Sequence, residues 1–361
     1  MIDKIDIKVG ILGCGEVGST FAGAISRCGA QVTVYDKLLE QDGGAEIIRD
    51  RLHRHLQQPL HLPFPPGTVD GGIKPGQIKL GSLREMVQGS DMILSTVTTD
   101  VAEKAAGEVV PYLHRGHIYV DMNSTAPQKK IAIAGLIMAT GADFVEGAIL
   151  EPVGAKGAAA RILLGGKAAE KAVGILRNLG LNTEFFSEVI GRAANFKMIR
   201  SIFTKGVECL LVELLIAARR TGIQNEIWQD ITGFMSGNPF EQLAANWIRT
   251  HVSAAGRRYH EMTQVAETVA EWGLDPLMTA ATRTFLARSA SAVAAIASHA
   301  GEDKPHIGED QPHTRGNQPR NKVQSGIEQS GIEQSGIEQS GIEQSGVKAV
   351  EQVITLLDAL L

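Results

Sequence analysis

Three glycines near the start of the chain have the spacing of a dinucleotide-binding loop. Residues 9–18 read V-G-I-L-G-C-G-E-V-G, an apolar strand that runs into Gly13, Gly15 and Gly18. The first glycine allows the tight turn, the second lets a pyrophosphate approach the backbone, and the third packs a helix against the strand. The helix expected from residue 16 to about residue 28 would present its free N–H groups and positive dipole end to the phosphates. The expected cofactor contacts in this loop are Gly13, Cys14, Gly15, Glu16, Val17 and Gly18.

An aspartate indicates which dinucleotide the loop binds. Asp36 ends a second expected strand, residues 31–35, eighteen residues after Gly18. A carboxylate there accepts hydrogen bonds from the adenosine ribose hydroxyls and repels a 2′-phosphate, so we expect NAD as the cofactor. Lys37 leaves NADP open, because a neighbouring cation could tolerate the extra phosphate. The alternative is a glycine turn that merely packs an α/β unit, and the context of strand, turn, helix and acid argues against it.

Composition limits the classes of partner. The 361 residues are 43% hydrophobic and 21% charged, which is typical of a soluble protein with room for two domains. The net charge of −5 favours neither a nucleic-acid partner nor a membrane surface. The chain has three cysteines, none at the spacing of a zinc pair, so we expect reduced thiols and a cytoplasmic protein. No sequence window is long and apolar enough to suggest a membrane-spanning helix.

The first half alternates short apolar runs with helical stretches. This pattern predicts an α/β fold with a Rossmann-type, doubly wound parallel sheet in a nucleotide-binding domain, residues 1–188. Beyond the first two strands, we expect strands at residues 78–81, 92–97, 117–121, 143–148, 161–165 and 182–186.

One connection in this half is unusually long. Residues 38–75 contain L-H-L-P-F-P-P-G, which cannot be regular helix, so an irregular insertion over the edge of the sheet is expected. Its histidines, His53, His55 and His61, have no carboxylate or cysteine at ligand spacing. We therefore expect surface histidines and no metal site.

After residue 190 the alternation of strands and helices ends, and the sequence predicts helices. Residues 192–220 are rich in alanine, leucine, glutamate and arginine and predict one helix of about 29 residues. Such a helix is long enough to join the nucleotide domain to an all-helical domain, residues 189–300, or to a partner subunit, so we expect a homodimer. Further helices are expected at residues 224–235, 240–249, 251–271 and 276–300.

The tail has a different character. Residues 301–346 are polar and contain S-G-I-E-Q four times in tandem. A period of five places successive isoleucines on different faces of a helix or strand, so we expect a flexible linker, with an ordered repeat as the alternative. Residues 347–361 have apolar residues at helical spacing and predict a terminal amphipathic helix that docks on this chain or on a partner.

Two more segments carry polar groups where a nicotinamide would lie, at the carboxyl ends of the strands. Residues 121–127, D-M-N-S-T-A-P, follow a strand, and residues 191–201, G-R-A-A-N-F-K-M-I-R-S, open the long helix. With the glycine loop, these segments resemble the β-hydroxyacid dehydrogenase family, which includes 3-hydroxyisobutyrate and 6-phosphogluconate dehydrogenases. The greatest likeness is to a bacterial branch whose C-terminal domain is described as phosphogluconate-dehydrogenase-like and NAD-binding. The resemblance covers residues 7–290.

The resemblance implies a catalytic lysine. Lys197 matches the family's general acid/base, whose ammonium polarises a carbonyl during reduction and whose amine accepts a hydroxyl proton during oxidation. A solvated lysine in the first turns of a helix is the alternative. Val97 and Thr98 match the loop that passes under the nicotinamide. The resemblance implies substrate contacts for Asn123 and Ser124, and the neighbouring segments add Thr125, Arg200 and Ser201. A plain helix cap at Ser124 or Thr125 is compatible with this role.

Two departures from the family leave the substrate open. The family's D-A-P-V-S-G-G is replaced by E-G-A-I-L-E-P-V-G, residues 146–154, and Ser201 stands where the family has asparagine. The expected function is hydride transfer between NAD(P) and a small β-hydroxy acid or related anionic alcohol. One alternative is an imine reductase-like enzyme, against which Lys197 argues because related imine reductases generally lack this lysine. The other is a non-catalytic, cofactor-binding interaction protein that uses the tail as a tether.

Overall fold

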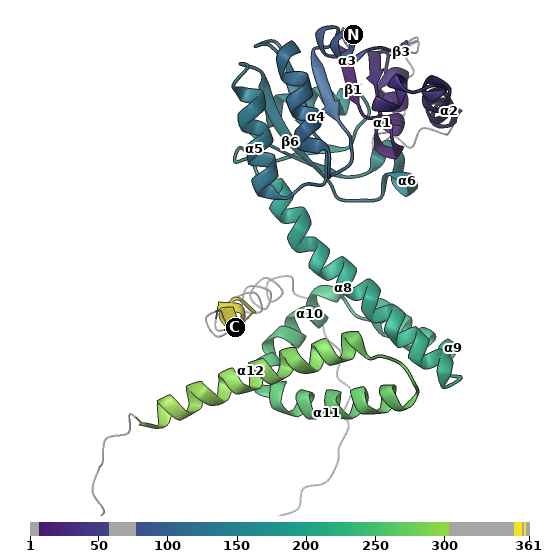
Figure 1. Ribbon diagram of the computed structural model, residues 1–361. Helices are drawn as coiled ribbons and strands as arrows, with labels where there is room; N and C mark the ends of the chain where they lie inside the picture. Colours follow the sequence, from purple (N-terminus) through teal and green to yellow (C-terminus); the bar gives the residue numbers. More distant parts are fainter. Residues whose placement is uncertain (1–6, 58–76, 303–349, 356, 359–361) are drawn as a thin grey trace, which may run out of the picture. The chain divides into compact units, whose positions relative to one another are not determined.

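The computed structural model describes residues 7–57, 77–302, 350–355 and 357–358 (Figure 1). The chain divides into two compact units, residues 1–204 and 205–361. This division falls sixteen residues after the expected boundary at 188, inside helix α8 (Arg192–Arg220). The first turn of α8 belongs to the first unit because Ala193 is buried in a cluster with residues of the sheet.

The first unit is built on an eight-stranded sheet in the order β3-β2-β1-β4-β5-β6-β7-β8. The strands are β1 (Lys8–Leu12), β2 (Gln31–Tyr35), β3 (Ile78–Leu80), β4 (Met92–Ser95), β5 (Ile118–Asp121), β6 (Asp143–Ile149), β7 (Ile162–Gly165) and β8 (Thr183–Ser187). The chain reverses its direction of winding between β1 and β4, and in doubly wound sheets a ligand binds at the carboxyl ends beside that point. The expected doubly wound α/β fold is confirmed.

The far edge of the sheet departs from the expected parallel arrangement. Strand β7 runs antiparallel to β6, and β8 runs parallel to β7. Only the short helix α6 (Val153–Lys156) and one 3-10 turn join β6 to β7. A parallel pair is usually joined by a full crossover helix, and this connection contains only about one helical turn, so the chain returns antiparallel.

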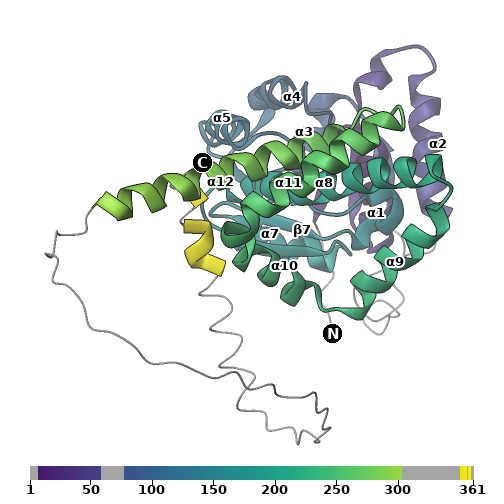
Figure 2. The same ribbon diagram turned by 90° about the horizontal axis from the view of Figure 1, so that it is seen from below.

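Helices cover both faces of the sheet. One face buries α1 (Glu16–Arg27), α2 (Gly44–Gln57) and α7 (Ala169–Asn178) in a single apolar cluster. The other buries α3 (Leu83–Gln88), α4 (Ala102–Val109) and α5 (Pro127–Met138) in a second cluster. Figure 2 shows α4 and α5 together on one side, with α1 and α7 on the other. This three-layer arrangement leaves the carboxyl edge of the parallel strands to the connecting loops.

Helix α2 corrects the expected irregular insertion at residues 38–75. Ile48 and Leu52, one turn apart, are buried in the same cluster as the residues of α1, and this stripe is enough to dock a helix. His53 lies exposed on α2, whereas His61 and the prolines fall among residues 58–76, outside the described residues. The expectation of irregular structure was therefore wrong for residues 44–57.

The second unit is helical. The long helix α8 has the expected bounds, and α9 (Gln224–Gly237), α10 (Phe240–Arg249), α11 (His251–Glu271) and α12 (Leu277–Glu302) follow it. Glu213 of α8 accepts hydrogen bonds from the N–H groups of Met278 (2.7 Å) and Thr279 (2.9 Å), which caps α12. After residue 300, the structure describes residues 301–302, which end α12, and residues 350–355 and 357–358, which are helical. Among the described helices, none combines the length and apolarity that a bilayer crossing requires.

Candidate active site

The three loop glycines each meet the steric demand that their spacing predicts. Gly13 has a φ of 91°, which favours glycine, and its N–H donates to the Tyr35 carbonyl at 2.8 Å. A Cβ on Gly18 would lie 2.0 Å from the Gly13 carbonyl oxygen, so only glycine packs α1 this closely against β1. A Cβ on Gly15 would have no described atom within 4 Å. The middle glycine therefore faces open space, as a pyrophosphate site requires.

That open space belongs to a cavity of about 450 Å³ at the carboxyl ends of β1, β2 and β4. Gly15 is the N-cap of α1, and no side chain among the described residues caps the helix there, so its first N–H groups remain available to an anion. Five of the predicted cofactor residues line this cavity: Gly13, Gly15, Asp36, Val97 and Thr98. The residues present therefore fit a dinucleotide, with Glu16, Val17 and Gly18 in the first turn of α1.

Cys14 contributes to this loop through its backbone. Its side chain is fully buried in the apolar cluster, and burial, aided by Asp36, raises the pKa of the thiol to about 12. The Cys14 N–H donates to Asp36 Oδ2 at 2.7 Å, while the Leu38 N–H donates to Asp36 Oδ1 at 2.9 Å. These two bonds hold the Asp36 carboxylate at the glycine loop.

An arginine that the sequence did not single out reaches the same cavity. Arg51 of α2 donates from Nη1 to the Cys14 carbonyl at 3.0 Å and lines the cavity with Asp36 and Lys37. Arg51 was missed because residues 38–75 were expected to be irregular structure, which gives no basis for placing a side chain. The cavity is thus lined by two carboxylates, Asp36 and Glu108, and by three cations, Lys37, Arg51 and Lys104.

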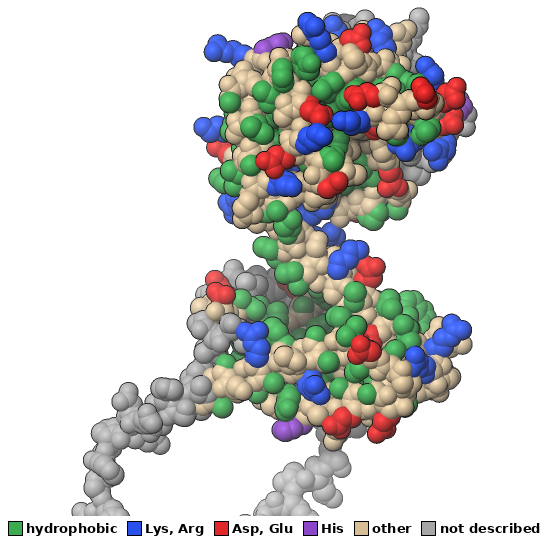
Figure 3. Space-filling view, viewed as in Figure 1, with side chains coloured by type: hydrophobic (Ala, Val, Ile, Leu, Met, Phe, Trp, Pro, Cys, Tyr) green, Lys and Arg blue, Asp and Glu red, His purple; other side chains and the backbone are tan. Residues whose placement is uncertain are grey.

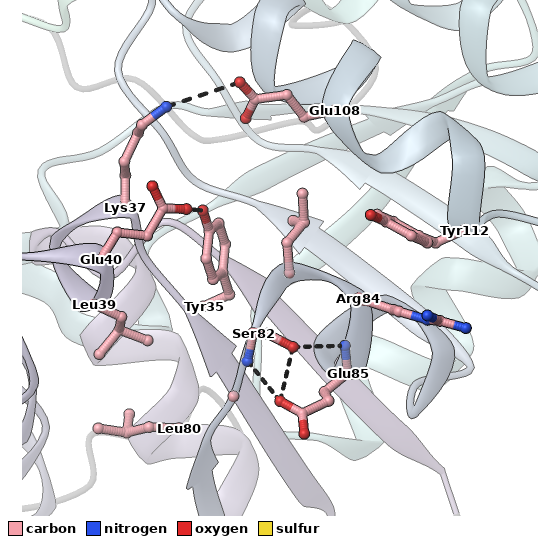
Figure 4. A pocket seen from close by; sticks show the side chains of 12 residues that line it. Tyr35, Lys37, Leu39, Glu40, Leu80, Ser82, Arg84, Glu85, Glu108 and Tyr112 are labelled. Carbon is pink, nitrogen blue, oxygen red and sulfur yellow. Dashed lines mark hydrogen bonds and ion pairs between the residues drawn. The ribbon is translucent and has the colours of Figure 1, made fainter.

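A second cavity, of about 700 Å³, continues from the first toward α3 (Figure 4). The two share Tyr35, Lys37 and Glu108. Tyr35 donates its hydroxyl to Glu40 Oε1 at 2.5 Å, and Lys37 lies 3.9 Å from Glu108. The space beside Asp36 is therefore lined by one ion pair, Lys37 with Glu108, and by one hydrogen-bonded pair, Tyr35 with Glu40.

The structure brings Lys197 and Ser124 together. Lys197, in the second turn of α8, donates from Nζ to Ser124 Oγ at 2.5 Å. Ser124 is exposed and follows β5, so the two segments predicted to form the substrate site meet through these side chains. Burial lowers the pKa of Lys197, and the positive charge of Lys130 lowers it further. A lowered pKa makes the amine of Lys197 a more readily available proton acceptor than that of an exposed lysine.

The other predicted substrate residues differ in their surroundings: Asn123 and Thr125 are buried, whereas Ser201 is half-buried and Arg200 is exposed. Asn123 is buried, and its Nδ2 donates to Ser95 Oγ at 2.9 Å and to Asp121 Oδ1 at 2.6 Å. Thr125 is also buried, Arg200 Nη1 donates to the Leu150 carbonyl at 2.8 Å, and Ser201 Oγ donates to the Lys197 carbonyl at 2.9 Å. Of the predicted substrate contacts, only Ser124 directly contacts the Lys197 amine in the described part of the chain.

Beneath Lys197 lies a buried polar cluster that the sequence did not reveal. Lys130 of α5 forms an ion pair with Asp121, and neither side chain is more than 1% exposed. Glu146 of β6 is fully buried and accepts from the N–H groups of Gly191 (2.8 Å) and Ala193 (3.0 Å). Glu146 was named only as part of a departure from the family, whereas here its carboxylate caps the start of α8.

Comparison with known proteins identifies the family. Residues 8–186 match the NAD binding domain of 6-phosphogluconate dehydrogenase, and residues 218–289 match a domain of unknown function, DUF1932. The conserved protein MTH1747, whose structure is described as similar to 3-hydroxyacid dehydrogenases, is 30% identical over 78% of this chain and 96% of its own, with a TM-score of 0.49. The chain belongs to the β-hydroxyacid dehydrogenase family. The expected resemblance is confirmed, and the first unit is an NAD-binding domain.

Other solved structures share the fold. A conserved hypothetical protein from Sinorhizobium meliloti 1021 is 26% identical over 84% of this chain and 92% of its own, with a TM-score of 0.51. An imine reductase from Myxococcus stipitatus, solved with NADP+, is 19% identical over 79% of this chain and 94% of its own, with a TM-score of 0.62. At that identity the second likeness concerns the fold alone.

Glycine substitutions test the cofactor site. We expect Gly15→Ala to weaken NAD binding about tenfold or more, since the methyl group enters the open space at the start of α1. The free energy of unfolding should change by less than about 1 kcal/mol, because the backbone there suits alanine. Gly18→Ala should weaken binding and also cost about 1–3 kcal/mol, because its Cβ meets backbone. Calorimetric titration and urea unfolding measure both quantities.

Gly107→Ala is the matched control. Gly107 lies inside α4 with no described atom near an added Cβ, so alanine should leave NAD affinity unchanged and add about 0.5–1 kcal/mol of stability. If Gly15→Ala bound NAD as tightly as Gly107→Ala, the cofactor would not pass over Gly15.

Proposed function

We propose that the protein is an NAD(P)-dependent dehydrogenase that acts on the CH–OH group of a small β-hydroxy acid or a related anionic alcohol. The observation that carries the proposal is the hydrogen bond from Lys197 Nζ to Ser124 Oγ, at the carboxyl edge of an NAD-binding sheet. Membership of the β-hydroxyacid dehydrogenase family supports the same reaction class.

In this proposal Lys197 is the general acid and base. During alcohol oxidation its neutral amine accepts the hydroxyl proton, and during carbonyl reduction its ammonium returns a proton to the oxygen. When bound, the nicotinamide accepts or donates the hydride. Ser124 holds Nζ in place, and the lowered pKa of Lys197 increases the fraction of neutral amine near pH 7. The ammonium form also favours a substrate that carries an anion.

The proposed cofactor preference is NAD. The Asp36 carboxylate lines the cavity and is fixed by two N–H groups, so it is positioned to accept from ribose hydroxyls and to repel a 2′-phosphate. Arg51 and Lys37 line the same cavity and keep NADP a usable second cofactor.

A substrate screen tests the function. The full chain is incubated with each of a set of 3-hydroxy acids and NAD or NADP, and formation of reduced nicotinamide is followed by absorbance. We expect turnover of at least one 3-hydroxy acid, faster with NAD. Cyclic imines and amine–ketone pairs with reduced cofactor form a second arm. Turnover in that arm alone would favour the imine reductase alternative, and NAD binding without turnover in either arm would favour a non-catalytic binding protein.

We also propose that the protein forms a homodimer through its helical unit. Large apolar side chains on α8, α9 and α10 are more than two-fifths exposed in the single chain, and Figure 3 shows hydrophobic side chains at the surface of this unit. They include Leu210, Val212, Trp228, Phe234, Phe240 and Trp247. An exposed apolar surface of this kind favours burial against a second copy. A monomer in sedimentation velocity would contradict the proposal.

A further inference from the structure

Lys130 is a buried lysine with an unusually complete set of acceptors. Its side chain is 1% exposed, and Nζ lies 2.7 Å from the Asp121 carbonyl, 3.3 Å from Asp121 Oδ1 and 3.4 Å from the Gly147 carbonyl. An ammonium has three protons and a neutral amine has two. Three oxygens, one of them on a carboxylate, therefore stabilise the charged form of Lys130, although burial has the larger effect and lowers its pKa.

These contacts link Lys130 to the loop that carries Ser124. Asp121, which ends β5, accepts from the Asn123 N–H at 3.0 Å as well as from Asn123 Nδ2. The Gly147 carbonyl belongs to β6, next to Glu146. Lys130 thus joins the end of β5 to β6 and, through Asp121 and Asn123, contacts the loop that carries Ser124.

Charges from three elements act on this pair of lysines. Asp121 of β5 and Glu146 of β6 face Lys130 and raise its pKa, against the larger effect of burial. Burial also raises the pKa of Glu146, and Lys130 and the N–H groups at the start of α8 lower it. Burial lowers the pKa of Lys197, and the positive charge of Lys130 lowers it further. In a buried site of low dielectric, a neighbouring cation disfavours a second ammonium.

We propose that Lys130 is a positioning residue for Lys197: its buried ammonium fixes the loop from Asp121 to Thr125 and, by charge repulsion, favours the neutral amine of Lys197. This inference rests on the proposed role of Lys197 as acid and base. It adds the charge of Lys130 to the burial that already lowers the pKa of Lys197.

The test measures the protonation of Lys197 without any substrate. The full chain is trace-labelled with acetic anhydride over a series of pH values, and mass spectrometry follows acetylation of the peptide that carries Lys197. Only the neutral amine reacts, so the midpoint of the labelling rate reports protonation and its high-pH plateau reports access. Exposed Lys171 in the same digest is the internal reference, and its profile should be the same in every variant.

We expect Lys130→Met to raise the Lys197 midpoint by about one pH unit, because Asp121 and Glu146 then act without a compensating cation. Lys130→Arg should keep the low midpoint. Glu146→Gln removes an anion and should move it the opposite way. A purely structural role for Lys130 would loosen the loop and raise the plateau, and it would not give shifts of opposite sign.

If Lys130→Met does not fold, the comparison of Asp121→Asn with Asp121→Asn/Lys130→Met measures the same shift without an unpaired buried carboxylate. An unchanged Lys197 midpoint in a folded Lys130→Met protein, or a folded Lys130→Arg protein with a raised midpoint, would overturn the inference. This test is independent of the test of the proposed function, because the Lys197 midpoint can shift as expected in a protein that oxidises no hydroxy acid.

Discussion

Lys197→Met is expected to lower kcat/KM for the 3-hydroxy acid found in the screen by about 10²–10⁴-fold, the usual contribution of a positioned general acid and base. Methionine keeps the length and apolar volume of the side chain but cannot accept the hydroxyl proton. NAD affinity should stay within about twofold, a difference of roughly 0.4 kcal/mol, since Lys197 does not line the glycine-loop cavity. Steady-state rates and calorimetric titration measure the two effects.

Lys205→Met is the matched control, because Lys205 lies two turns further along α8. It is exposed and pairs with Glu208 at 2.8 Å, a surface contact of little energetic weight. It should leave kcat/KM unchanged. In the unmodified enzyme, oxidation should become faster as the pH rises through the lowered pKa of Lys197, and this limb should vanish in Lys197→Met. Equal losses in the two variants would remove Lys197 from the chemistry.

The parts of the fold that local chemistry determines could be predicted from the sequence. The bounds of α8 were predicted because residues 192–220 are mostly strong helix formers and Gly191, with a φ of 96°, precedes them. The roles of Gly13 and Gly18 were predicted because their demands are steric and local. The direction of β7 was not predicted, since a short apolar run carries no sign of which way its strand pairs.

Within residues 38–75, the prolines hid the pattern of a neighbouring helix. The prolines between residues 63 and 66 led to the expectation of irregular structure, yet the preceding residues 44–57 form α2. The apolar pair Ile48 and Leu52 was the available signal for a helix. The same error concealed Arg51, which reaches the cofactor cavity only because α2 is helical.

Part of the candidate site could likewise be predicted from the sequence, and part could not. The meeting of Lys197 with Ser124 followed from the family resemblance, which related segments 73 residues apart. The buried role of Lys130 did not follow, because Lys129 and Lys130 are adjacent and only the docking of α5 decides which one faces inward. Glu146 was visible as an unusual acid after β6, but its partners are backbone N–H groups 45 and 47 residues away.

Glu146 of β6 caps the start of α8, the helix that carries Lys197. Its Oε1 accepts from the Gly191 and Ala193 N–H groups, and Oε2 accepts more weakly from Ala194 at 3.4 Å. A Cβ on Gly165 would lie 2.6 Å from Oε1, so that glycine leaves room for the carboxylate. Since Lys197 lies six residues after Gly191, the direction in which α8 begins sets the position of its amine.

Glu146→Ala should therefore lower the free energy of unfolding by about 2–4 kcal/mol, since it leaves the first N–H groups of α8 buried without an acceptor. Glu146→Gln retains one oxygen for Gly191 and Ala193 and should cost less than about 2 kcal/mol at neutral pH. Burial raises the pKa of Glu146, so the folded state binds its proton more tightly and loses stability as the pH rises through that pKa. Glutamine does not titrate, so its cost should be largest at acidic pH. Urea unfolding at several pH values gives these differences, and a Glu146→Ala variant as stable as the unchanged protein would show that the cap contributes nothing.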